Sequence, residues 1–112
     1  MDNMNMNMNM NLLVNDVALR IKQVSDYSDT YVSRLRVDFL NGYSLSIIRG
    51  WGTYGSASGL FEIAVIKDDE FVTRSLGEMR GFGDICDDVI GWQTEAEVRD
   101  WAVFVANLSD GG

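Results

Sequence analysis

The stretch SRLRVDFLNGYSLSIIR, residues 33–49, decides the fold. From Leu35 to Phe39, apolar residues alternate with charged ones, which is the pattern of a strand with one buried face. Asn41-Gly42 is a strong signal for a hairpin turn. We therefore predict two antiparallel strands joined at this dipeptide.

The length of the hairpin loop sets the register of these strands. A two-residue loop would place Phe39 opposite Ser44 and would split the apolar face. A three-residue loop, Leu40-Asn41-Gly42, needs Gly42 in a left-handed conformation and keeps the face together. That register pairs Phe39 with Tyr43, Val37 with Leu45 and Leu35 with Ile47, and it is the one we predict.

The alternation continues beyond the hairpin. GLFEIAVI, residues 59–66, predicts a third strand with alternate apolar residues facing inward. Lys67-Asp68-Asp69 predicts a turn. EFVTRSL, residues 70–76, then predicts a fourth strand.

Helical patterns flank the strands. Thr94 and Glu97 have the spacing of a capping box, and the apolar residues after them recur every three or four positions. These are Val98, Trp101, Ala102, Val105 and Leu108. Residues 12–24 also show helical spacing and favour a short helix, although Val17, Leu19 and Ile21 would equally suit a strand.

The chain thus predicts a single α+β domain over residues 12–112. Its core is a four-stranded antiparallel β-meander with a C-terminal amphipathic helix packed on it and a short N-terminal helix. Residues 1–11, MDNMNMNMNMN, precede it as a low-complexity tail. The tail is either flexible or a Met-rich adhesive arm, since Met adapts to irregular apolar surfaces.

Composition excludes several functions. Seventeen acidic residues against nine basic ones give a net charge of −8, which disfavours direct binding to nucleic-acid phosphates and favours a basic partner. The absence of histidine excludes catalysis and zinc binding that need it. A single cysteine, Cys86, precludes an internal disulfide and fits a reducing compartment. With neither a membrane span nor a signal segment in the sequence, we expect a cytoplasmic location.

The loop after the second predicted strand contains Gly50-Trp51-Gly52-Thr53-Tyr54-Gly55, a G-x-G-x-x-G pattern. Dinucleotide binding needs these glycines between a strand and a helix, whose N-terminus faces the pyrophosphate. Here a strand follows instead. We therefore expect no nucleotide cofactor at this loop.

The segment RGWG, residues 49–52, recurs as RGFG, residues 80–83. One interpretation is that these aromatic rings fold back and cap the core. The other is a recognition patch, because Trp, Tyr and Arg dominate interface hot spots. Its members would be Arg49, Trp51, Tyr54, Arg80 and Phe82.

Asp84, Asp87 and Asp88 form an acidic cluster. A calcium loop starting at Asp84 would need an oxygen ligand and a glycine where Cys86 and Val89 stand. We therefore expect no metal, and we assign the three carboxylates to the same partner-binding surface. No nucleophile has a plausible base beside it in sequence, so no catalytic residue and no enzyme activity are predicted.

Three segments resemble a group of small phage- and prophage-encoded proteins: the N-G-Y strand start, YGSASGLFEIAV and DDVIGWQTEAE. The resemblance spans about residues 33–108 and implies phage origin and a single small domain, but no reaction. The Met/Asn tail, the first helix and SLGEMRGFGD, residues 75–84, depart from the group's short form.

Together these features predict a non-enzymatic phage or mobile-element accessory protein that binds and inhibits a host protein with a basic surface. A defence or nucleic-acid-processing complex is one such target. The alternatives are a binder of a nucleotide-like or sugar-like ligand and a minor virion or assembly component.

Overall fold

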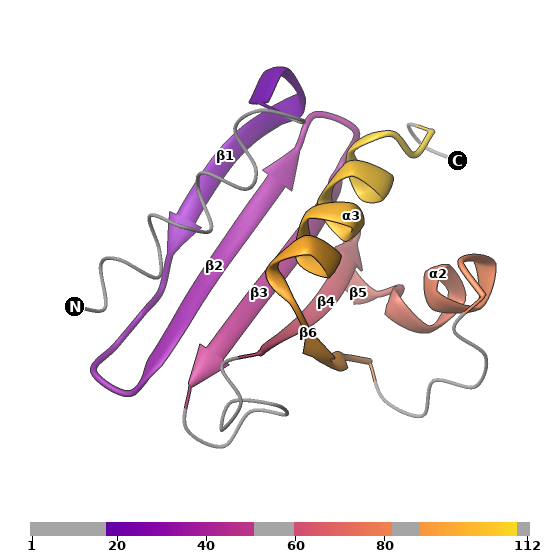
Figure 1. Ribbon diagram of the computed structural model, residues 1–112. Helices are drawn as coiled ribbons and strands as arrows, with labels where there is room; N and C mark the ends of the chain where they lie inside the picture. Colours follow the sequence, from indigo (N-terminus) through magenta and orange to yellow (C-terminus); the bar gives the residue numbers. More distant parts are fainter. Residues whose placement is uncertain (1–17, 51–59, 82–87, 110–112) are drawn as a thin grey trace.

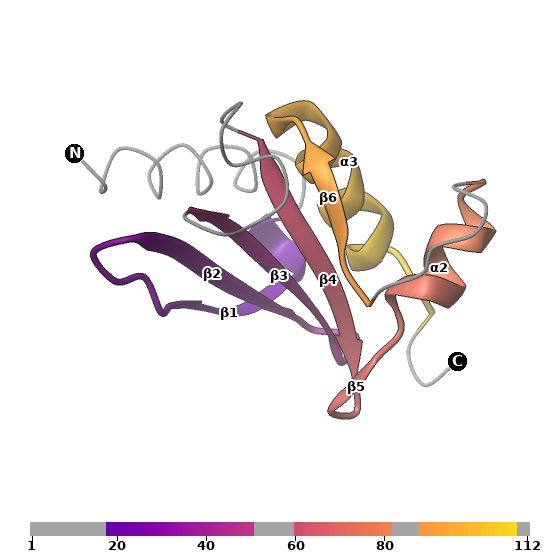
Figure 2. The same ribbon diagram turned by 90° about the horizontal axis from the view of Figure 1, so that it is seen from below.

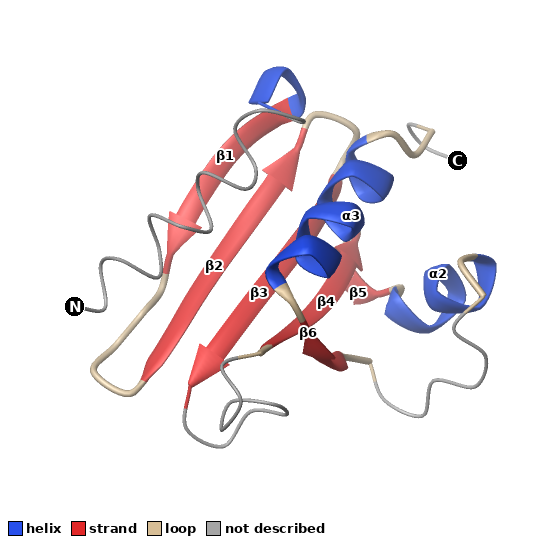
Figure 3. Cartoon of the chain, in the orientation of Figure 1, coloured by secondary structure: helices blue, strands red, loops and turns tan. Residues whose placement is uncertain are grey.

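The computed structural model describes residues 18–50, 60–81 and 88–109 and shows an antiparallel sheet with helices (Figures 1 and 3). The elements are η1 (Ala18–Arg20), β1 (Ile21–Asp26), β2 (Val32–Phe39), β3 (Tyr43–Gly50), β4 (Phe61–Lys67), β5 (Glu70–Phe71), α2 (Thr73–Met79), β6 (Ile90–Gln93) and α3 (Glu95–Ala106). The strand order is β1-β2-β3-β4, and both β5 and β6 pair with β4. The α+β class and the antiparallel sheet are confirmed.

The β2–β3 hairpin has the predicted three-residue register. Val37 lies opposite Leu45, and Leu35 lies opposite Ile47. Gly42 has a φ of 89°, and its N–H donates to the Phe39 carbonyl at 3.2 Å. The register places the apolar side chains of both strands on one face, where they are buried.

Helix α3 covers that apolar face (Figure 2). Thr94 caps the helix: its hydroxyl accepts the Glu97 N–H at 3.2 Å, and the Glu97 carboxylate accepts the Thr94 N–H at 2.9 Å. Both halves of the predicted capping box are therefore present. The predicted stripe is buried from Val98 to Val105, with Trp101 at 0% exposure.

Asn41 fastens the hairpin to the end of α3. Its Nδ2 donates to the carbonyl of Val105 at 2.8 Å and to that of Leu108 at 3.0 Å, while its Oδ1 accepts the Tyr43 N–H at 3.1 Å. The last carbonyls of a helix lack partners within the helix, so Asn41 supplies an additional donor where the chain leaves α3. Turn chemistry predicted Asn41 in the loop but not this second contact.

The fourth predicted strand is largely wrong. Asp68 and Asp69 make the predicted turn with φ values of 53° and 64°, but the strand after it stops at Phe71. The Thr73 hydroxyl then accepts the Val65 N–H at 2.9 Å, which replaces the next ladder bond, and the chain enters α2. Strand β6 pairs with the rest of the β4 edge that β5 leaves open, with Phe61 opposite Gln93.

The predicted N-terminal helix is also wrong over residues 21–24, which belong to β1. Ile21 and Val24 are three residues apart, a helical spacing. A bulge between Ile21 and Gln23 adds one residue to the strand. Both side chains therefore pack against the core, with Ile21 opposite Phe39 and Val24 opposite Val37. The tail of residues 1–11 lies outside the described residues. No helix in the described ranges is long and apolar enough to cross a bilayer.

Candidate functional site

The structure describes three of the eight predicted site residues: Arg49, Arg80 and Asp88. The other five, Trp51, Tyr54, Phe82, Asp84 and Asp87, lie outside the described residues. The predicted recognition patch on the two loops that carry RGWG and RGFG, which we call the Gly-aromatic loops, therefore stays a prediction. The two arginines can be placed.

Arg49 lies near the end of β3, on the strand face that carries Leu45 and Ile47 into the core. Its guanidinium carbon is 4.9 Å from the centroid of the Phe61 ring. Such a distance permits a cation–π contact, which favours a guanidinium held flat against a ring. Arg49 therefore contacts a ring on the neighbouring strand.

Arg80 follows α2 and reaches α3. Its guanidinium carbon is 4.5 Å from the centroid of the Trp101 ring and 5.1 Å from that of Phe104. The two rings meet edge to face, with centroids 5.8 Å apart. Arg80 thus joins α2 to the buried face of α3, and its aliphatic stem and charge both contribute to that contact.

Arg49 and Arg80 are linked through neighbouring residues. Arg49 contacts Phe61, and Phe61 is the ladder partner of Gln93. Gln93 and Arg80 line a cavity of about 120 Å³ together with Glu97, Asp100 and Trp101. This volume is below the roughly 300–1,000 Å³ typical of small-molecule sites, so the cavity is too small for a nucleotide.

Five basic side chains in the described ranges contact other groups of the chain, although Arg20, Lys22 and Arg74 are exposed. Lys67 Nζ lies 4.8 Å from the Tyr43 ring centroid and donates to the Asn41 carbonyl at 3.2 Å. Arg34 and Arg36 form ion pairs with Asp29 and Asp38, at 3.3 Å and 3.1 Å. With Arg49 and Arg80 on their rings, five of the nine basic residues have such contacts.

Many acidic side chains, by contrast, are exposed to solvent. Asp68, Asp69 and Glu70 are exposed at the turn between β4 and β5. Exposed carboxylates also occur on α2, before β6 and on α3, at Glu78, Asp88 and Asp100. Within the described ranges, the ion pairs use Asp29 and Asp38 rather than these six. We call these six residues the acidic surface; its elements all lie at the β4 edge of the sheet or on α3.

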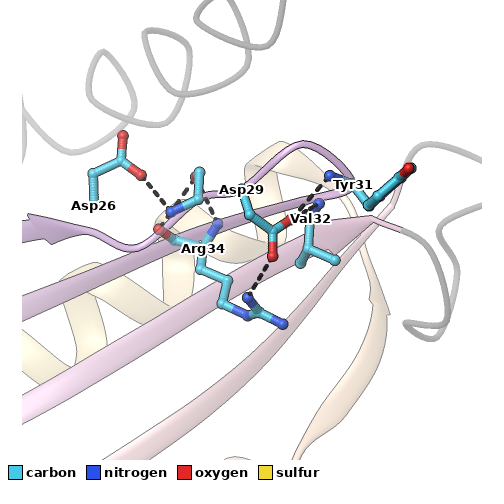
Figure 4. A network of polar contacts seen from close by, with 6 residues as sticks. Asp26, Asp29, Tyr31, Val32 and Arg34 are labelled. Atoms are coloured by element: carbon cyan, nitrogen blue, oxygen red, sulfur yellow. Dashed lines mark hydrogen bonds and ion pairs between the residues drawn. The ribbon is translucent and has the colours of Figure 1, made fainter.

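Two other carboxylates stabilise the fold at the opposite edge. Figure 4 shows Asp29 accepting the N–H groups of Tyr31 and Val32, both at 2.9 Å. These bonds, helped by Arg34, lower the pKa of Asp29 below its usual 3.8. Burial opposes ionisation of Asp38, but bonds from Ser44 and Arg36 outweigh it, so the pKa of Asp38 is also lowered.

Trp92 is an exposed aromatic residue that the sequence analysis did not select. Its side chain is 62% exposed, and its backbone has a φ of 61°. A bulky residue in this left-handed region is strained by about 1–2 kcal/mol. The strain follows from the irregular pairing of β6 with β4. The sequence signal was Trp92 beside Gly91 within DDVIGW. A glycine in place of Trp92 would have adopted this left-handed conformation without strain.

Metal binding finds no support in the described ranges, where no group of three Asp, Glu, His or Cys residues could hold an ion. Asp84 and Asp87 lie outside those ranges. Asp88 is exposed before β6 and belongs to the acidic surface.

Comparison with protein-family models, with curated proteins and with solved structures found no match to this chain. The resemblance to phage-encoded proteins therefore stays a prediction based on the three motifs. The arguments about function rest on the arrangement of charged and aromatic side chains.

Proposed function

We propose that this chain is a non-enzymatic accessory protein of phage or mobile-element origin that binds and inhibits a host protein in the host cytoplasm. The target presents a basic surface, as the nucleic-acid grooves of defence and processing complexes do. Phage origin is supported by the three motifs, and binding is supported by the described surface.

The unequal use of charges carries the proposal. Five of the nine basic side chains contact rings, a carbonyl or carboxylates of the chain itself, whereas the six carboxylates of the acidic surface are exposed and form none of the ion pairs in the described ranges. Exposed carboxylates at one edge of the sheet would give that edge a negative potential. Such a potential accelerates encounter with a basic partner and opposes encounter with nucleic acid.

Inhibition follows from competition. A groove that binds phosphates has Lys and Arg side chains arranged for negative charge. Carboxylates of the acidic surface would occupy that groove and exclude the nucleic acid without any chemical step. The Gly-aromatic loops, with Trp51, Tyr54 and Phe82, would supply the apolar contacts that such charged contacts need for affinity.

Trp92 is an exposed aromatic residue, within the described ranges, that a partner could contact. It is exposed, lies on β6 next to the acidic surface in sequence, and follows Asp88 by four residues. Exposed Trp residues are the commonest strong contributors to interfaces. Its strained backbone is consistent with a position kept for its side chain rather than for stability.

The experiment is affinity capture from host lysate, with mass spectrometry and then quantitative binding to the recovered protein. The test variant combines Asp68→Asn with Asp69→Asn, because Asn tolerates the positive φ of this turn. The control combines Asp26→Asn with Asp29→Asn in the turn at the other edge, where Asn keeps the carbonyl acceptor for the backbone. We expect weaker binding from the test variant only. Equal binding by both variants, or capture of nucleic acid rather than a basic protein, would contradict the proposal.

A further inference from the structure

Gln93 lines the cavity beside Arg80 and has a buried oxygen that lacks a donor. Gln93 is 5% exposed, and its Oε1 has no hydrogen-bond partner among the described residues. The other end of the amide is engaged, because Nε2 donates to the Gly91 carbonyl at 3.1 Å. An unpaired buried acceptor costs about 1–3 kcal/mol, so a ligand that donates to it gains a bond that would relieve this cost.

The charges around the cavity favour a cationic donor. Glu97 and Asp100 line it, and both are exposed on α3. Arg80 also lines it, but its guanidinium lies over the Trp101 and Phe104 rings. Two carboxylates and one guanidinium leave the lining with a net charge of −1.

The size of the cavity limits what can enter. About 120 Å³ holds a few water molecules or one side-chain head group, and it opens to solvent beside α3. A guanidinium is planar and carries five N–H donors, so it can donate to the amide oxygen and to a carboxylate at once. An ammonium is more strongly hydrated and loses more on entering a partly closed site.

We propose that this cavity binds the guanidinium of an arginine side chain, with Gln93 Oε1 as the buried acceptor and Asp100 as the carboxylate at the mouth. The inference rests on the proposed function, since the arginine is supplied by the basic host partner. It adds a defined anchor to the acidic surface, at a site lined by described residues.

The test is an NMR titration of the ¹⁵N-labelled full chain with methylguanidinium chloride at constant total salt. We expect saturable shifts in the Gln93 side-chain amide and the Trp101 indole N–H. A probe of about five heavy atoms reaches a Kd of about 1–100 mM. Neutral N-methylurea, similar in shape, should bind at least about 3-fold more weakly because it lacks the charge.

Three variants assign the contacts. Gln93→Met keeps the side-chain volume and removes the acceptor, and it should weaken binding about 10-fold or more. Asp100→Asn lies on the exposed face of α3 and should weaken binding about 3-fold. Asp26→Asn neutralises an exposed carboxylate at the other edge of the sheet, outside both the lining and the acidic surface, and should leave methylguanidinium binding unchanged. If Gln93→Met does not fold, Asp100→Asn and the urea comparison carry the test.

Each result separates this inference from the proposed function. Shifts that do not saturate, equal binding of methylurea, or full binding by Asp100→Asn would overturn the arginine site. If the recovered host protein binds Gln93→Met and the native chain equally, the arginine site fails while the proposed function stands. If methylguanidinium binds as expected but no basic host protein does, the site stands and the proposed function fails.

Discussion

Replacing Asn41 tests the contact between the hairpin and α3. Asn41→Ala removes the bonds to the carbonyls of Val105 and Leu108, at 2.8 Å and 3.0 Å. At about 1 kcal/mol of net stability for each bond, the loss is about 2 kcal/mol. For a domain of this size that lowers Tm by roughly 10 °C.

Asn41→Asp sharpens the same prediction. The introduced carboxylate still accepts the Tyr43 N–H, so the turn is kept, but it faces the negative end of the α3 dipole. We expect a loss of about 3 kcal/mol at neutral pH, more than for Asn41→Ala. The carbonyls raise the folded-state pKa of the introduced carboxyl. Its protonated form can donate, so the penalty should shrink as the pH falls through that pKa.

Thermal and urea unfolding monitored by circular dichroism would measure both variants. Asn107→Ala is the matched control, because Asn107 Nδ2 donates to the Val103 carbonyl within α3 at 2.7 Å and is exposed. A local surface bond of this kind should contribute under about 0.5 kcal/mol. If Asn41→Ala costs no more than Asn107→Ala, the hairpin is not energetically coupled to the helix and the reasoning fails.

Three further predictions use single substitutions with matched comparisons. Gly42→Val should destabilise by more than Gly81→Val, because both residues have positive φ but at Gly42 a Cβ would displace Lys67 Nζ from the Asn41 carbonyl and the Tyr43 ring; equal losses of Tm would show that these Lys67 contacts add no stability. Trp92→Asn should leave unfolding stability unchanged or raise it by up to about 1 kcal/mol while weakening partner binding by about 2 kcal/mol; a clear loss of stability would assign Trp92 to the fold. Because the pKa of Asp38 is lowered in the folded state, its ionised carboxylate stabilises the fold above pH 3.8, and this stabilisation is lost as the pH falls below that value. The Tm difference between the native chain and Asp38→Asn should therefore shrink on acidification; a constant difference would exclude this contribution of Asp38.

The parts of the fold that the sequence predicts well are those where one local rule dominates. Alternation from Leu35 to Phe39 and the left-handed preference of Gly42 fixed the hairpin register, and the Thr94–Glu97 box fixed the start of α3. Each rule involves residues close in sequence, and each serves the buried face that the whole fold needs.

The failures come from contacts between distant residues. The sequence after Phe71 predicts a continuing strand. In the structure the Thr73 hydroxyl accepts the Val65 N–H, and β6 pairs with the rest of that edge of β4. In β1, the bulge gives a strand the spacing of a helix. The candidate site shows the same limit. Arg49 and Arg80 were selected from the repeated RGxG segments. Their ring partners, and the buried Gln93 Oε1 that lacks a donor, depend on tertiary packing.

The most direct test of the acidic surface is the association rate constant with the recovered host protein, measured by stopped flow over ionic strengths from about 0.03 to 0.3 M. Opposite charges steer association in low salt, and salt screens them over a Debye length of about 10 Å at 0.1 M. We predict that the rate constant of the native chain falls by about 10-fold or more across this range, and that the variant with Asp68→Asn and Asp69→Asn shows a shallower fall. A rate constant that does not change with salt, or that rises, would contradict binding through the acidic surface.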